Sequence, residues 1–166
     1  MRLTLAAVGA VVAALLQLTI ARYLQVGGAE PDLLLVFAVA TVVAGDLEGG
    51  LVWAFLGGLM LDVLVPRPLG LTAFTLLAAV GLASVLARVL DRTGLFAAPL
   101  ATFPTSIVTS GLFVLAYGIL RGPVPVADPV GAVLPAALYS TVVALAVGPL
   151  VVRLRQRAAV RERVGW

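Results

Sequence analysis

The sequence contains no cysteine, no histidine and no lysine, and only 11% of its 166 residues are charged. Without Cys or His the chain has no disulfide, no thiolate nucleophile, no Cys/His zinc site and no imidazole base. Without Lys it lacks a Walker-type phosphate loop and Schiff-base chemistry. Only the eight carboxylates remain for acid–base work. Because of these absences we expect no enzyme, no cofactor and no catalytic or metal-ligating residue.

What the sequence has in abundance is apolar side chains, which make up 62% of it. A soluble domain is about 45–50% apolar and about 25% charged, so this chain has too little polar surface to face water. Six spans of about 20 residues would use about 120 residues. We therefore predict an all-α integral membrane protein built as a bundle of six transmembrane helices. Nucleic-acid binding is not expected, because the surplus positive charge lies in one tail.

The boundaries of the spans follow the gaps between charged residues, because a charge at the bilayer centre costs roughly 2.5–3.5 kcal/mol. The long gaps predict four spans, at residues 3–21, 68–87, 93–120 and 129–152. Two shorter uncharged runs, 33–45 and 49–61, either cross the membrane twice or form one re-entrant hairpin. We favour two crossings, because the apolar residues 63–65 lengthen the second run beyond Asp62.

The arginines predict the orientation, since cytoplasmic loops carry an excess of basic residues. We expect one six-span domain over residues 1–152 and a basic cytoplasmic tail over 153–166. With six spans both termini share a side, and that side holds Arg2, Arg88, Arg92 and the tail. The chain is therefore predicted to be a multi-pass protein with both termini in the cytoplasm.

The tail itself is rich in arginine, and each basic residue beside an anionic leaflet contributes about 1 kcal/mol of attraction. Retention of the predicted topology is the simpler role of this charge, and docking of a cytoplasmic partner is the other. The predicted membrane-surface residues are Arg153, Arg155, Arg157, Arg161 and Arg163.

The last predicted span carries a small residue at every fourth position. On a helix this spacing forms a stripe that lets another backbone approach closely. The stripe either packs within the chain's own bundle, which we favour, or receives a span of a partner. Its members are Ala132, Ala136, Ser140, Ala144 and Gly148.

Asp62 is the most informative single residue, because a carboxylate inside a membrane span is a functional-site hypothesis by default. It would pair with Arg67, ligate a cation together with Asp32, or relay protons. The structural alternative is a carboxylate at a helix end that is either solvated at the membrane interface or accepts local hydrogen bonds. Asp32, which follows Pro31, has the simpler interpretation of an acidic residue in the first turn of a span.

Two local patterns resemble a known family. The first is PDLLLV at 31–36, and the second is GGLMLD at 57–62 followed by PLGL at 68–71. An aspartate that ends a glycine-containing helix, before a short loop and PLGL, resembles the bacterial rod shape-determining protein MreD family. That family often has Ser-Gly in the loop, where this chain has Val-Pro-Arg. The matching motif positions, our functional candidates, are Pro31, Asp32, Asp62, Pro68 and Gly70.

The resemblance implies a non-enzymatic component of the bacterial cytoplasmic (inner) membrane that serves the cell-elongation machinery. Such a protein supports peptidoglycan synthesis and rod cell shape by binding the bitopic protein MreC. Through MreC it associates indirectly with RodA, the elongation transpeptidase and MreB. The resemblance also implies a fold similar to the S components of energy-coupling-factor transporters.

Two other functions remain open. The first is that the chain is itself a substrate-binding S component for a vitamin-like molecule. The small number of polar residues in its spans disfavours a polar ligand. The second is a carboxylate-dependent proton or cation carrier using Asp62, Asp46 and Glu48.

Overall fold

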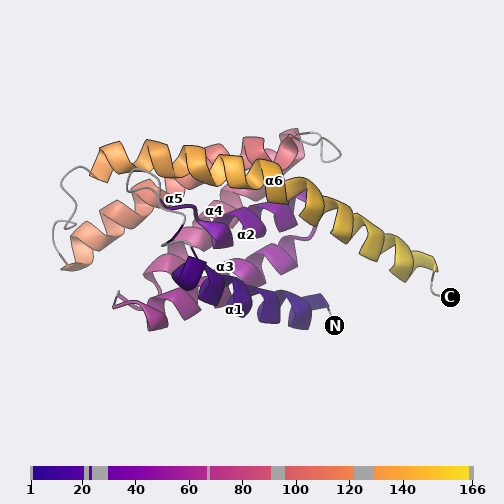
Figure 1. Ribbon diagram of the computed structural model, residues 1–166, viewed down its shortest axis with the longest axis horizontal. Coiled ribbons are helices and arrows are strands. Elements are labelled where there is room, and N and C mark those ends of the chain that lie inside the picture. The colour runs from indigo at the N-terminus through magenta and orange to yellow at the C-terminus, as the bar shows by residue number, and fades with distance from the viewer. Residues whose placement is uncertain are drawn as a thin grey trace.

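The computed structural model describes residues 2–20, 23, 30–66, 68–90, 96–121 and 129–164. Within these residues all regular secondary structure is helical, which confirms the all-α prediction. The helices are α1 (Arg2–Ile20), α2 (Leu33–Val43), α3 (Leu47–Leu64), α4 (Leu71–Val89), α5 (Ala97–Arg121) and α6 (Pro129–Val164) (Figure 1). They follow the predicted order.

Four of the helices are long and apolar enough to cross a membrane. They are α3, α4, the Ala97–Leu120 part of α5 and the Val133–Val151 part of α6. The apolar stretches of α1 and α2 are shorter, at Ala6–Thr19 and Leu33–Val43. At 1.5 Å per residue, α2 is about 16 Å long, roughly half of a hydrocarbon core of about 30 Å. Six crossings therefore stay a prediction, while four helices have the length and apolar composition that a crossing requires.

The short helix α2 is the centre of the bundle. It contacts every other described helix, and nine of its 11 residues are buried. Within the described chain α1 contacts only α2 and α3, and α6 contacts only α2 and α5. Figure 1 shows α2 in the middle of the ribbon, with α5 and α6 running beside each other along one side. The α1 side and the α5–α6 side are thus connected by α2 and also by α3 and α4, which link α1 to α5.

Small residues allow the helices around α3 to pack closely. A Cβ atom on Gly9 of α1 would lie 2.8 Å from Cζ2 of Trp53, whose ring stacks on Phe37 at a centroid distance of 5.1 Å. A Cβ atom on Gly57 would lie 2.5 Å from Cδ2 of Leu34. Close packing of this kind is the main attraction between helices in lipid, where apolar burial brings no gain over contact with acyl chains.

Helix α6 is much longer than a membrane crossing requires. Its 36 residues span about 54 Å at 1.5 Å per residue, and its C-terminal part projects beyond the other helices, at the end of the bundle where α1 begins (Figure 1). The predicted tail therefore continues α6 without a break in the helix at residue 152. Arg153 is exposed. The side chains of Arg155, Arg157, Arg161 and Arg163 lie outside the described side chains.

Candidate functional site

Asp62 lies in the last turn of α3 and is 2% exposed. Its two carboxylate oxygens accept the backbone N–H of Thr72, at 3.1 and 3.0 Å, and Oδ2 also accepts the N–H of Ala73 at 3.4 Å. Both donors belong to the first turn of α4, where backbone N–H groups have no partner within their own helix. Asp62 therefore caps the helix that follows its own in the chain.

Helix α4 needs this cap because its own N-cap position is Gly70, which has no side chain to supply one. Gly70 has a φ of +86°, a left-handed conformation that glycine adopts without a steric penalty. The N–H of Leu71 donates to the carbonyl of Pro68 at 3.2 Å and closes the turn. The PLGL sequence thus turns the chain so that the first turn of α4 faces Asp62.

Gly58 lies one helical turn before Asp62 and provides the space for this approach. A Cβ atom at Gly58 would lie 2.5 Å from Cα and 2.7 Å from the backbone nitrogen of Ala73. These are backbone atoms, which no rotamer change moves aside. We call this region the α3–α4 junction, and it comprises Gly58, Asp62, Pro68, Gly70, Thr72 and Ala73.

The geometry of Asp62 matches the structural alternative, a helix-end carboxylate that accepts local hydrogen bonds. Arg67, the first partner considered for Asp62, lies outside the described residues. Asp32 accepts a hydrogen bond from Leu35 of α2, whereas Asp62 accepts its hydrogen bonds from α4. Among the described residues there is no group of three His, Cys, Asp or Glu side chains arranged for a metal ion.

Asp32 caps the start of α2 in a second region. Its Oδ1 accepts the N–H of Leu35 at 3.0 Å, and its own backbone N–H donates to Oγ of Ser140 in α6 at 3.1 Å. The N–H of Leu34 donates to Oε1 of Gln17 in α1 at 3.1 Å. The first turn of α2 is therefore held by its own aspartate and by polar side chains of α1 and α6.

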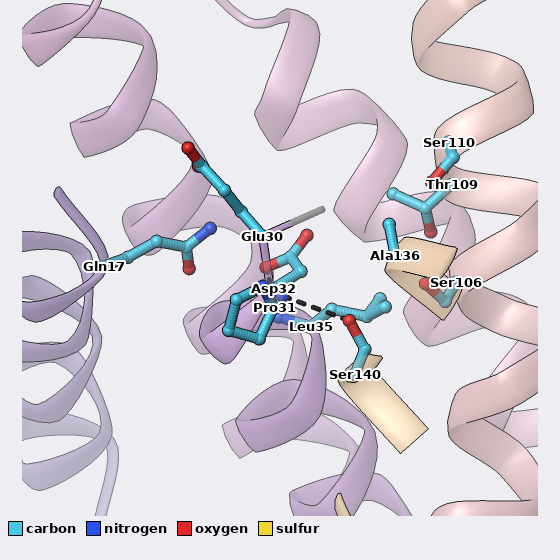
Figure 2. Close-up of a pocket in the computed structure, with 10 residues that line it drawn as sticks. All are labelled: Gln17, Glu30, Pro31, Asp32, Leu35, Ser106, Thr109, Ser110, Ala136 and Ser140. Carbon is cyan, nitrogen blue, oxygen red and sulfur yellow. Dashed lines mark hydrogen bonds between the residues drawn. The ribbon is translucent and has the colours of Figure 1, made fainter. Parts of the chain in front are cut away.

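A polar pocket of about 180 Å³ opens at this point, and we call it the α2-entry pocket. It lies where α2 begins, and its described lining comes from α1, from residues 30–35, and from α5 and α6. Figure 2 shows Gln17 on one side of Asp32 and the α5 and α6 residues on the other. The lining residues are Gln17, Glu30, Pro31, Asp32, Leu35, Ser106, Thr109, Ser110, Ala136 and Ser140.

Part of the small-residue stripe of α6 lies inside the chain's own bundle. Ser140, Ala144 and Gly148 are buried, and a Cβ atom at Gly148 would lie 2.8 Å from Cβ of Ala98 in α5. Ala136 is half-buried and lines the α2-entry pocket. The side chain of Ala132 lies outside the described side chains.

The motif positions thus fall into two groups. Pro31 and Asp32 belong to the α2-entry pocket, and Asp62, Pro68 and Gly70 belong to the α3–α4 junction. Sequence reasoning missed that polar residues from α1, α5 and α6 converge on Asp32. The available signal was the presence of Gln and Ser in the middle of apolar spans, but four separate segments contribute and their juxtaposition depends on the fold.

A third aspartate has the same structural task. Oδ1 of Asp46 accepts the N–H of Gly49 at 2.8 Å and caps α3. Asp32, Asp46 and Asp62 therefore cap the starts of α2, α3 and α4 in turn. Cap hydrogen bonds of this kind each contribute about 1 kcal/mol to helix stability in water-soluble proteins.

Comparison with known proteins identifies the family. The family model described as rod shape-determining protein MreD matches residues 2–158, which include the α2-entry pocket and the α3–α4 junction. No curated protein and no solved structure gives a significant match. The resemblance inferred from the two sequence patterns is confirmed. The chain belongs to the MreD family of rod shape-determining proteins, and this membership implies a role in rod shape determination.

Proposed function

We propose that this protein is a non-enzymatic scaffold of the cell-elongation machinery in the bacterial cytoplasmic membrane. It binds MreC and, through MreC, supports RodA, the elongation transpeptidase and MreB during peptidoglycan synthesis. Beside the family match, the proposal rests on the structural role of Asp62. Both oxygens of this buried carboxylate accept backbone N–H groups of α4, so it stabilises helix packing.

A carrier function using Asp62 fits this geometry poorly. A carboxylate that relays protons or cations alternates between ionised and neutralised states during each cycle. The backbone N–H groups of Thr72 and Ala73 already occupy both oxygens of Asp62. Each neutralisation would also weaken the cap on α4, so a carrier cycle would loosen the α3–α4 junction.

The protein offers exposed apolar faces on which a partner's transmembrane helix can pack. On α1, Val8, Val12 and Leu15 are exposed along one face. On α6, Leu138 and Val142 are exposed at helical spacing, beside the buried small-residue stripe. A bitopic partner such as MreC contributes a single span, and one such face is sufficient for it.

Affinity capture from the native membrane in mild detergent tests the scaffold proposal. We expect MreC to be enriched over an unrelated tagged membrane protein of similar size. A photocrosslinking residue at Val12 or at Leu138 would then show which face MreC occupies, with the buried Leu76 as the matched negative position. Failure to enrich MreC, in an extract that contains it, would contradict the proposal.

The S-component alternative is supported by one observation, the presence of the α2-entry pocket. Ligand pockets usually enclose about 300–1,000 Å³, whereas this one encloses about 180 Å³. The small volume favours the scaffold. Recovery of paired ATPases with a membrane coupling subunit in the same capture experiment would instead favour the S component.

Both termini are proposed to lie in the cytoplasm, with the arginine-rich end of α6 at the anionic inner leaflet. The absence of cysteine makes the test simple, because each introduced cysteine is the only thiol in the chain. A cysteine at Arg163 should be protected from a membrane-impermeant thiol reagent in intact cells and labelled after lysis. Labelling in intact cells would overturn the orientation.

A further inference from the structure

We draw no further inference here: the strongest candidate, the outward face of α4 where the small residues Ala78, Gly81 and Ser84 lie at helical spacing and an added Cβ at Gly81 would meet no atom within 4 Å, is a stripe of small residues, and nothing in the described part of the structure shows what covers it.

Discussion

The α3–α4 junction and the α2-entry pocket use the same device with opposite results. In each, an aspartate accepts a backbone N–H at the start of a helix. At the junction α4 begins directly against Gly58 of α3, which leaves no room for another atom. At the pocket α2 begins between α1 on one side and α5 and α6 on the other, α1 has no described contact with α5 or α6, and a cavity remains. The difference shows that the surroundings of a cap decide whether it closes the structure or leaves a cavity.

The largest loss of thermal stability should come from a bulky side chain at the α3–α4 junction. In Gly58→Leu the side chain meets backbone atoms of Ala73, and overpacking of this kind costs typically 1–3 kcal/mol or more. We expect a markedly lower Tm, or no folded protein, measured by loss of helical circular dichroism in nanodiscs. Gly81→Ala on α4 is the matched control, because its added Cβ meets no atom within 4 Å. Equal Tm values for Gly58→Leu and the wild type would contradict the described packing.

The second-largest loss of thermal stability should come from removing the Asp62 cap on α4. Asp62→Ala leaves the N–H groups of Thr72 and Ala73 without their acceptor, and each buried orphan donor costs about 1–3 kcal/mol. Asp62→Asn keeps one acceptor oxygen and should lose less. The Tm should therefore fall in the order wild type, Asp62→Asn, Asp62→Ala. An alanine variant as stable as the wild type would show that the hydrogen bonds of Asp62 contribute nothing.

The same substitution in the pocket should cost less. Asp32→Ala removes the cap on Leu35, with an expected loss of about 1 kcal/mol, because water in the open pocket is able to replace the carboxylate. Asp32→Asn should unfold at nearly the wild-type temperature. The comparison fails if Asp32→Ala lowers the Tm more than Asp62→Ala does.

The smallest effect is expected for Ser140→Ala. The variant removes the acceptor of the Asp32 N–H, with a cost of about 0.5–1.5 kcal/mol for a neutral hydrogen bond. Because the site borders the pocket, water should recover part of that loss. A Tm decrease as large as that of Asp62→Ala would show that Ser140 is a main connection between α6 and α2.

The sequence predicted the helices well, because charged residues and prolines mark most of their ends. It also predicted that the third helix continues past Asp62, from the apolar residues 63–65. The central position of α2 was not predicted from the sequence, since it depends on contacts with all the other described helices. A fully buried helix has no polar face from which its orientation can be predicted.

The sites were only partly predictable. Asp62 was recognised as unusual from its depth in an apolar segment, and local hydrogen bonding was among its alternatives. Its donors, Thr72 and Ala73, follow a turn whose direction depends on the left-handed conformation of Gly70. The α2-entry pocket was not foreseen, because Gln17 and Ser106 are far apart in the chain and meet only after folding.

The central claim is that Asp62 holds α4 in place and carries out no chemistry. Its most direct test is the cell shape supported by Asp62→Asn, expressed at the wild-type level in cells depleted of their own MreD protein. Our account predicts rod-shaped growth close to that of the wild type, because the variant keeps an acceptor for the N–H of Thr72. Loss of rod shape with a variant that is folded and present in the membrane at the wild-type level would contradict the account.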